Sequence, residues 1–172
     1  ALQSLRSALP GDAHITAAVR SGMKPLLRGH PAVDDIVNID PCGVLGPWKA
    51  GRVIAATKPN TIVILPGSFR TALAAWLARG CRRIGYARDG RGWLLSDAIT
   101  APDREHPVST VHWYQGLITK AAPSLPSLVV TDDDQRAADD VLCEQPAAYI
   151  LLVPGANRDD KRWPADRFAA IA

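Results

Sequence analysis

The sequence predicts an α/β fold built on a Rossmann-like parallel sheet flanked by helices. Strand-like and helix-like segments alternate along the 172 residues, and no internal repeat stands out. Such alternation is typical of parallel strands joined by right-handed crossovers. The clearest strand, residues 61–65, is β-branched and apolar on both faces, as a strand between two layers of helices must be.

Turn and cap residues divide the first half of the chain into short elements. In order, the sequence predicts a helix over 1–9, a strand over 14–19, a short helix over 24–29, a strand over 33–39, a helix over 48–58, a strand over 61–65 and a helix between 68 and 80. Pro10 and Gly11 stop the first helix, and Pro59 follows the helix that precedes the third strand. Ser68 is the expected N-cap of the next helix, and Gly80 ends it.

The second half of the chain continues the alternation. It is predicted to hold a strand over 83–86, an extended segment over 93–96, a helix over 108–121, a linker over 123–126, a strand over 128–130, a helix over 132–144 and a strand over 149–153. Thr131 caps the helix at 132, and acidic residues open its first turn, where the helix dipole favours them. The breaks at 123–126 and 145–146 predict one domain over 1–145 and the beginning of a second over 146–172.

Charge and cysteine content exclude some classes of function. The net charge of +3, from 20 basic and 17 acidic residues, is too balanced to indicate a nucleic-acid partner. No apolar run approaches the roughly 20 residues that span a bilayer. Three widely spaced cysteines show neither zinc-ligand nor disulfide spacing, so we expect reduced thiols in a cytosolic protein.

The last expected strand leads into a candidate phosphate site. A small-residue loop follows residues 149–153, and Pro164 stands where the next helix should begin. Backbone N–H groups at a helix start suit a diphosphate. The residues expected to contact the phosphate are Lys161, Asn157, Gly155 and Ala156. The alternatives are that Lys161 is an exposed loop cation and that Asn157 only bonds its own turn.

A second candidate site follows the strand at 61–65. Ligands of open α/β sheets bind beyond the carboxyl ends of the strands. The residues expected to bind an anionic ligand there are Ser68, Arg70, Arg88 and Arg91. Arginine grips carboxylates and phosphates in a bidentate way, and the wider basic cluster also suits anionic lipid headgroups. The alternatives are a plain N-cap role for Ser68 and a solvated face for the arginines.

Three blocks of the chain, taken in order, resemble one enzyme family. They are Leu-Pro-Gly-Ser-Phe-Arg-Thr-Ala-Leu at 65–73, Arg-Ile-Gly-Tyr at 83–86 with Arg-Asp-Gly-Arg-Gly-Trp-Leu-Leu-Ser-Asp at 88–97, and Val-Pro-Gly-Ala-Asn-Arg-Asp-Asp-Lys-Arg-Trp-Pro at 153–164. The ordered set is similar to the ADP-heptose:lipopolysaccharide heptosyltransferase family. The Leu-Pro-x-Ser-Phe form favours its heptosyltransferase II branch.

The resemblance implies a GT-B architecture, in which two Rossmann-like domains face a cleft. The chain would be the N-terminal acceptor domain without its first strand, followed by the beginning of the domain that takes ADP-L-glycero-D-manno-heptose. The family implies transfer of this heptose to the lipopolysaccharide inner core with inversion. It also implies a cytoplasmic protein that works peripherally at the inner membrane, with no metal and no cofactor besides the donor substrate.

The resemblance places the catalytic base in a Gly-Asp loop upstream of Ala1. Gly11 and Asp12 do not match that loop, because they follow a helix and precede a strand, so a turn is expected there. We therefore assign no catalytic residue and expect the 172-residue excerpt to be inactive by itself. Two other functions stay open: a non-catalytic Rossmann-like module that binds a nucleotide or an anionic glycan, and a GT-B transferase that uses another sugar nucleotide.

Overall fold

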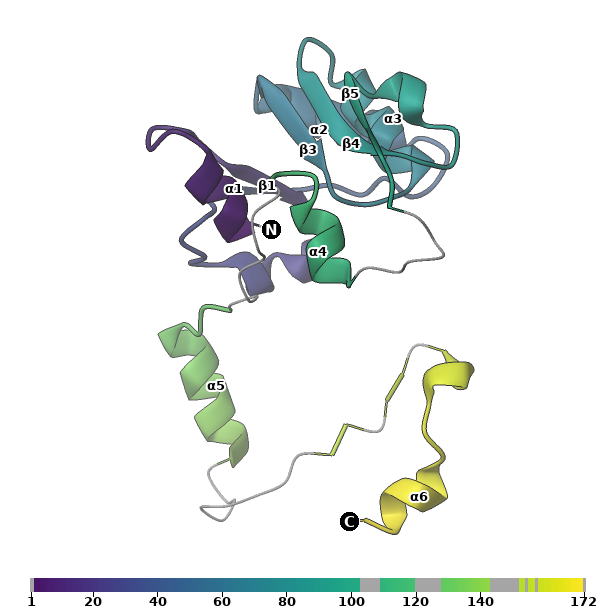
Figure 1. Ribbon diagram of the computed structural model, residues 1–172. Coiled ribbons are helices and arrows are strands. Elements are labelled where there is room, and N and C mark those ends of the chain that lie inside the picture. The colour runs from purple at the N-terminus through teal and green to yellow at the C-terminus, as the bar shows by residue number, and fades with distance from the viewer. Residues whose placement is uncertain are drawn as a thin grey trace. The chain divides into compact units, whose positions relative to one another are not determined.

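The computed structural model describes residues 2–102, 109–119, 128–142, 152–153, 155–156 and 158–171 (Figure 1). The chain forms two compact units, Ala1–Val129 and Val130–Ala172, and each is described by itself. The domain boundary predicted at 145–146 falls outside the described residues and stays a prediction.

The first unit alternates strands with helices, as the sequence predicts. Its elements are α1 (Leu2–Ala8), β1 (Thr16–Val19), the 3₁₀ helices η1 (Ser21–Met23) and η2 (Pro25–Leu27), β2 (Asp35–Asn38), α2 (Gly46–Ala56), β3 (Thr61–Ile64), α3 (Phe69–Leu77), β4 (Arg82–Ala87), the 3₁₀ helix η3 (Gly92–Leu94), β5 (Asp97–Thr100) and α4 (Thr110–Gln115). The short helix expected at 24–29 is thus part of a pair of 3₁₀ turns. The helix predicted over 108–121 forms over the six residues of α4.

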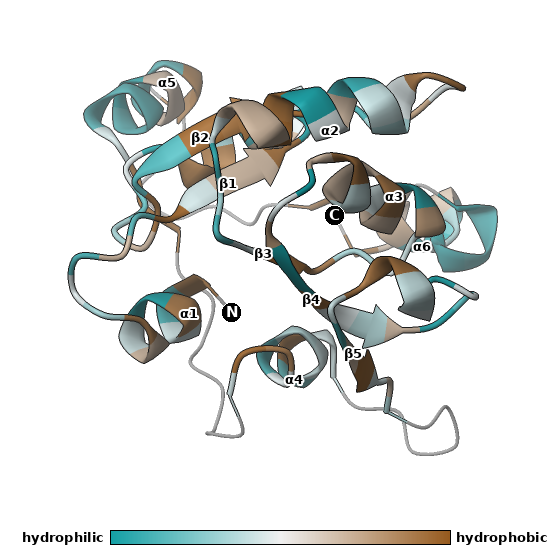
Figure 2. Cartoon of the chain, turned by 90° about the horizontal axis from the view of Figure 1, so that it is seen from above, coloured by the Kyte–Doolittle hydropathy of each residue, from teal (hydrophilic) through white to brown (hydrophobic). Residues whose placement is uncertain are grey.

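The strands of the first unit pair in parallel. β1 pairs with β2 in a two-stranded sheet, and β3, β4 and β5 follow one another in a three-stranded sheet. The predicted α/β architecture with parallel strands is therefore confirmed. Figure 2 shows α2 and α3 on one side of the three-stranded sheet and α4 on the other.

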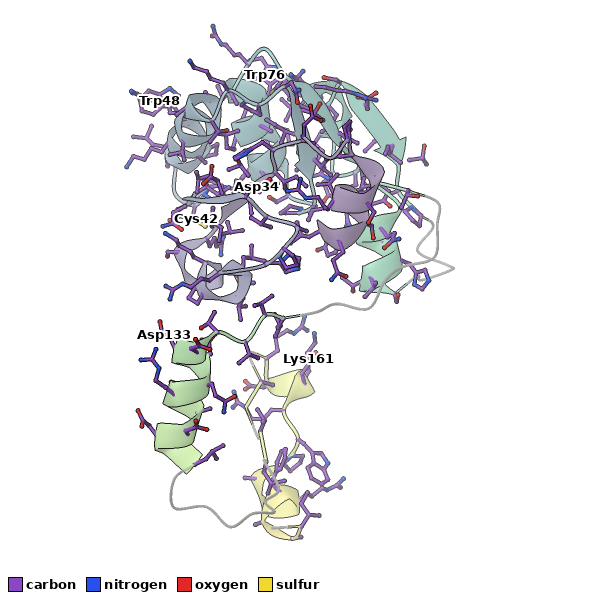
Figure 3. The ribbon with its side chains drawn as sticks, turned by 90° about the vertical axis from the view of Figure 1, so that its left-hand side faces the viewer. Asp34, Cys42, Trp48, Trp76, Asp133 and Lys161 are labelled. Carbon is purple, nitrogen blue, oxygen red and sulfur yellow. The ribbon has the colours of Figure 1, made fainter. Side chains whose placement is uncertain are left out.

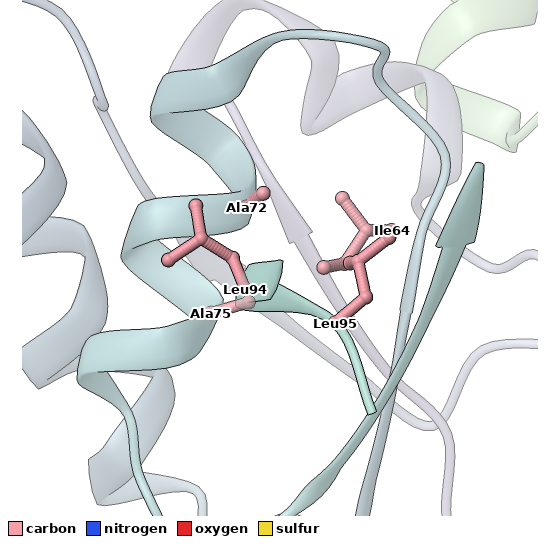
Figure 4. Packing of buried hydrophobic residues seen from close by; sticks show 5 residues of the cluster. All are labelled: Ile64, Ala72, Ala75, Leu94 and Leu95. Atoms are coloured by element: carbon pink, nitrogen blue, oxygen red, sulfur yellow. The ribbon is translucent and has the colours of Figure 1, made fainter. Parts of the chain in front are cut away.

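The main core lies between the three-stranded sheet and α3. Ile64 of β3 clusters with Ala72 and Ala75 of α3 and with Leu94 and Leu95 (Figure 4). The two alanines are 0% and 1% exposed. Because their side chains are so small, the backbone of α3 lies close to the sheet.

The helices α2 and α3 also pack directly on each other. Ala50 and Ile54 of α2 contact Ala74 of α3 in a second buried cluster. At Gly51 the helices come so close that a Cβ built there would lie 2.8 Å from the Ala74 carbonyl oxygen and 2.8 Å from the Leu77 Cβ. Small residues on both helices therefore set the distance between them.

Residues 93 and 94 lie in a 3₁₀ turn, contrary to the extended segment predicted over 93–96, whereas Leu95 is extended as predicted. The 3₁₀ helix η3 covers Gly92–Leu94, and β5 starts only at Asp97. Leu94 is 0% exposed and Leu95 is 8% exposed. An extended chain would send two successive side chains to opposite faces, whereas the 3₁₀ turn lets both leucines enter the same core.

The second unit begins with an acidic helix, α5 (Asp132–Leu142), and also holds η4 (Asp159–Lys161) and α6 (Ala165–Ala169). The predicted cap of α5 is confirmed. The Thr131 hydroxyl accepts a hydrogen bond from the Asp134 N–H at 3.3 Å, and the Asp134 carboxylate accepts one from the Thr131 N–H at 3.0 Å. This reciprocal arrangement satisfies two backbone donors at the helix start.

The two strands predicted at 128–130 and 149–153 are not found among the described residues. Residues 128–130 lie in no strand, so that prediction is wrong. An apolar triplet needs a neighbouring strand for its backbone hydrogen bonds, and no described strand pairs with this one. Leu152 and Val153 are also outside any strand, and residues 149–151 lie outside the described ranges.

Asp34 connects α1 to the start of the first sheet. Its carboxylate accepts hydrogen bonds from the Ile15 N–H at 2.6 Å and from the Arg6 guanidinium at 2.5 Å. The bond from the Ile15 backbone, followed by that from Arg6, holds the pKa of Asp34 below its usual value of 3.8. Because the pKa is lower in the folded state, the ionised carboxylate stabilises the fold at neutral pH. This contribution is lost as the pH falls through the folded-state pKa.

Asp34→Asn is expected to lower the Tm near pH 7 and to make the Tm fall less as the pH is lowered. The amide keeps the size of the side chain but loses the charge that strengthens both hydrogen bonds. Thermal unfolding followed by circular dichroism, from about pH 7 to about pH 3, measures both effects. Asp12→Asn is the control, because Asp12 is exposed and lies in a turn. Acid dependence in the Asp34 variant equal to that of the wild type would contradict the prediction.

Candidate functional site

The carboxyl ends of β3 and β4 meet at one loop, Pro66 to Ser68, from which α3 starts. In parallel α/β sheets this edge is where ligands bind. The four residues predicted for the acceptor site lie on α3, at its start, or in the turn that follows β4. The structure brings three of them, Ser68, Arg88 and Arg91, to this loop.

Ser68 caps α3, which was one of the two roles expected for it. Its hydroxyl accepts a hydrogen bond from the Thr71 N–H at 3.3 Å and lies 3.0 Å from the Thr71 hydroxyl. Ser68 is nevertheless exposed at the helix start. A contact between this hydroxyl and an acceptor therefore stays a prediction.

Arg91 is completely buried beneath the same loop, with 0% of its surface exposed. Its Nε donates to the Tyr86 carbonyl at 2.9 Å. Its Nη1 donates to the Pro66 carbonyl at 2.6 Å and to the Ser68 carbonyl at 3.2 Å. The side chain thus ties the end of β3 to the end of β4. Its Nη2 is also buried and has no hydrogen-bond partner among the described residues.

The buried guanidinium makes the loop electropositive from within. Burial, and after it the charge of Arg88, lowers the pKa of Arg91, although arginine stays protonated at neutral pH. A buried charge is stabilised by an opposite charge or by further hydrogen bonds. The Nη2 group of Arg91 therefore favours an anion or a polar group close to this loop.

A left-handed turn sends Arg91 back under β4. Asp89 has a φ of 52° and Gly90 a φ of 71°, and Asp and Gly are the residues that adopt this region most readily. The Asp-Gly pair is visible in the sequence, but the direction of the next side chain is not. The burial of Arg91 is accordingly the feature that sequence reasoning missed.

Arg88 lies against the same loop at Gly67. A Cβ added to Gly67 would lie 3.4 Å from the Arg88 Cδ, so the arginine stem rests on this glycine. The guanidinium pairs with Asp89 at 3.3 Å and lies 5.7 Å from the centre of the Trp113 ring. Because the Arg88 side chain is 36% exposed, it is accessible to a ligand.

Arg70 makes its contacts elsewhere. Its Nε donates to the Pro41 carbonyl at 2.8 Å, and its Nη2 donates to the Gly43 carbonyl. Arg70 therefore braces the loop that follows β2 and does not join Arg88 and Arg91. Its predicted role in acceptor binding stays a prediction.

In the second unit, the predicted phosphate loop has three neighbouring cations, Arg158, Lys161 and Arg162, which differ in whether they pair with carboxylates. Arg158 forms a two-bond ion pair with Asp160, with both distances at 2.8 Å, and Arg162 pairs with Asp159 at 3.1 Å. The side chain of Lys161 is exposed and makes no ion pair with any residue that the structure describes. Of these three neighbouring cations, Lys161 is the one free to meet a phosphate; Figure 3 labels it.

The small residues of the phosphate loop are described in part. The Ala156 carbonyl accepts a hydrogen bond from Arg162 at 3.1 Å, which holds the loop against the turn that contains Lys161. Gly155 is exposed, and a Cβ there would have no atom within 4 Å. Asn157 lies outside the described residues, so its predicted role stays a prediction.

The helix that was expected to begin at Pro164 is present one residue later. Pro164 is the N-cap of α6, whose five residues run from 165 to 169. Trp163 packs edge-on against Phe168, with 4.8 Å between the ring centres. This aromatic pair anchors the chain where it enters the helix.

The described ranges hold neither a cluster of metal ligands nor a membrane-spanning helix. There, no three His, Cys, Asp or Glu side chains come together as they would around a metal ion. Likewise, none of the described helices has the length and apolar character needed to cross a bilayer.

The sequence pattern of glycosyltransferase family 9 (heptosyltransferase) matches residues 48–172. The chain belongs to this family. The matched part of this family 9 chain includes both candidate sites, whereas β1 and β2 precede it. No match was found among curated proteins.

Two solved structures share the fold of the family 9 chain. The ADP-heptose LPS heptosyltransferase II of E. coli gives a TM-score of 0.78 at 22% identity, over 99% of this chain and 54% of that one. A glycosyl transferase family 9 protein of Veillonella parvula DSM 2008 gives 0.80 at 18% identity, over 99% of this chain and 52% of that one. This chain therefore has an α/β fold that matches GT-B glycosyltransferase structures and spans about half of their length.

Proposed function

We propose that this chain is part of an inverting glycosyltransferase that moves L-glycero-D-manno-heptose from ADP-heptose to the lipopolysaccharide inner core. Membership of family 9 over residues 48–172 carries the proposal, and the similarity of fold to a heptosyltransferase supports it. The reaction would take place in the cytoplasm. Because the chain covers about half of each matched structure, we expect the 172 residues alone to be inactive.

The donor half of the proposal depends on Lys161. When the acceptor oxygen attacks the anomeric carbon, the bond from that carbon to the diphosphate breaks and ADP leaves with the electron pair. A nearby cation stabilises the negative charge that develops on the leaving group. Lys161 is suited to this role because Arg158 and Arg162 are already paired with carboxylates.

The acceptor half of the proposal depends on the loop between β3 and α3. Arg88 is accessible and can form a bidentate pair with a carboxylate or phosphate of the acceptor. Arg91 is completely buried and does not contact the acceptor, but its positive charge beneath the loop favours an anion there. The acceptor hydroxyl must also lose its proton to a base, and we assign no residue of this chain to that step.

Lys161→Ala, in a protein that joins this chain to the other half of the GT-B fold, is expected to reduce kcat/KM for ADP-heptose by roughly 10-fold to 100-fold. One hydrogen bond to a charged group contributes about 1.5–3 kcal/mol, which corresponds to a change of that size. The measurement is ADP release with an inner-core oligosaccharide as acceptor. Lys24→Ala is the matched control, because Lys24 is an exposed lysine far from the phosphate loop in sequence.

Each result of this assay has a definite meaning. Transfer with ADP-heptose that falls in the Lys161 variant alone supports the proposal. Equal kcat/KM in both variants contradicts the role of Lys161. Transfer from a different sugar nucleotide contradicts the proposed donor, and nucleotide binding without transfer in the two-domain protein contradicts the proposed catalysis.

A further inference from the structure

Acidic residues are absent from a long central part of the chain. Residues 41–88 contain eight lysines and arginines and no aspartate or glutamate, although the whole chain is nearly balanced. This stretch covers α2, β3, α3 and β4. Positive charge is therefore concentrated on the first unit, and any partner of this part of the surface must tolerate or neutralise it.

The outward face of α2 combines that charge with exposed apolar side chains. Ala50, Gly51 and Ile54 point inward and are buried. The opposite face carries Trp48 and Lys49, followed four residues later by Arg52 and Val53, so that these four share one side of the helix. Trp48 is 50% exposed and Val53 is 37% exposed; Figure 3 labels Trp48 on the outside of this helix.

The turn that leads into α2 extends this face. Val44 is 95% exposed and Leu45 is 61% exposed, an unusual degree of exposure for large apolar side chains in a row. We define the α2 surface by six residues: Val44, Leu45, Trp48, Lys49, Arg52 and Val53. The Arg52 guanidinium lies 4.9 Å from the centre of the Trp48 ring, so charged and apolar groups are interleaved on this surface.

A hollow beside the α2 surface contains one carboxylate. The hollow has a volume of about 570 Å³, and its lining includes Asp40, Val44, Leu45 and Lys49. The Cys42 N–H donates to Asp40 at 3.0 Å. The bonds from Cys42, with smaller effects from Arg20 and Arg70, lower the pKa of Asp40. Asp40 is therefore already compensated by its neighbours and does not neutralise the α2 surface.

We propose that the α2 surface docks the chain on a membrane that contains anionic phospholipids. Tryptophan and aliphatic side chains enter the interface between headgroups and acyl chains, while lysine and arginine at their edge meet the lipid phosphates. A second copy of the chain fits this surface less well. A symmetric contact would bring Lys49 and Arg52 of both copies together, with no acidic residue on the surface to pair with them.

Co-sedimentation with lipid vesicles tests the proposal on the 172-residue chain. One set of vesicles contains phosphatidylcholine with roughly one-third phosphatidylglycerol, and the other contains phosphatidylcholine alone. Binding is measured at about 0.1 M and about 1 M salt, because screening lengths fall from about 10 Å to about 3 Å over this range. We expect binding to the anionic vesicles at low salt, much weaker binding at high salt, and little binding to the neutral vesicles.

Two double variants separate the electrostatic and apolar parts. Lys49→Gln with Arg52→Gln is expected to reduce the partition coefficient of the chain onto anionic vesicles roughly 25-fold. Each cation near an anionic surface changes this coefficient by roughly five-fold. Leu45→Ser with Trp48→Ser is expected to reduce it roughly 10-fold or more through lost apolar contact. Leu45 is the N-cap of α2, a position where serine is favoured, so this variant should keep its helix.

Matched controls come from α5, where the surroundings are acidic. Val141→Ser removes an apolar side chain that is 76% exposed, and Arg136→Gln removes an exposed cation; neither should change binding. Equal binding to both kinds of vesicle, no binding to either, or unchanged binding of both double variants would overturn the proposal. The proposal would also be overturned if light scattering showed that the chain associates with itself and that Leu45→Ser with Trp48→Ser abolishes this association. None of these outcomes depends on which sugar donor is used.

Discussion

Arg91→Met should lower the free energy of unfolding by about 2–4 kcal/mol. Methionine retains most of the apolar stem but has no donor for the carbonyls of Tyr86, Pro66 and Ser68. A buried carbonyl left without a partner costs about 1–3 kcal/mol; this applies in full to Tyr86, whereas the bonds to Pro66 and Ser68 are only partly buried and contribute less. Removing the buried charge and its unpartnered Nη2 offsets part of this loss, which is why the expected value is smaller than the sum.

Urea unfolding near pH 7, followed by circular dichroism, measures this effect. Arg91→Lys is the matched variant, because lysine keeps the charge but cannot hold three carbonyls in the fork geometry of a guanidinium. We expect its stability to lie between those of the wild type and the methionine variant. If Arg91→Met were as stable as the wild type or more so, burial of the cation would outweigh its hydrogen bonds, and the bracing role would be wrong.

Gly51→Val should destabilise the first unit by about 3 kcal/mol or more. A Cβ at this position would already lie 2.8 Å from the Ala74 carbonyl oxygen and from the Leu77 Cβ, and valine adds two further methyl groups. In an exposed helix, replacing glycine usually stabilises by up to about 1 kcal/mol. Here the collision outweighs that gain, because the backbone of α3 cannot move away without leaving the sheet.

Differential scanning calorimetry of the purified chain gives the change in Tm. The control is Ala56→Val, which introduces the same side chain at the exposed end of α2 and should change stability by about 0.5 kcal/mol or less. Similar Tm values for the two variants would show that the helices can separate at little cost. The close α2–α3 contact would then have no energetic importance.

Elements with local signals were predicted well from the sequence. The strand at 61–65 and the helix after Ser68 were recognised from β-branched residues and an N-cap, and β3 and α3 confirm both. The cap at Thr131 was likewise predicted and found. An N-cap signal depends mainly on the residue and its immediate neighbours, so the rest of the fold alters it little. The strand signal at 61–65 held because β4 pairs with β3.

Predictions that depended on distant contacts failed or stayed incomplete. Residues 93–96 were expected to be extended, but residues 92–94 form a 3₁₀ turn that buries Leu94 against α3, and of the predicted segment Leu95 has extended dihedral angles. Arg70 was placed with the other arginines by its position after β3. Its contacts with the carbonyls of Pro41 and Gly43 join residues 27 and 29 positions apart, and no local pattern reveals them.

The brace formed by Arg91 also determines how the loop between β3 and α3 responds to a ligand. Three hydrogen bonds fix this loop to the end of β4 in the free protein. An arriving anion therefore meets a loop whose backbone already has its final position. The entropy of ordering the loop is lost during folding and not at the moment of binding. Preorganisation of this kind is expected to favour fast, rigid-body recognition over an induced fit.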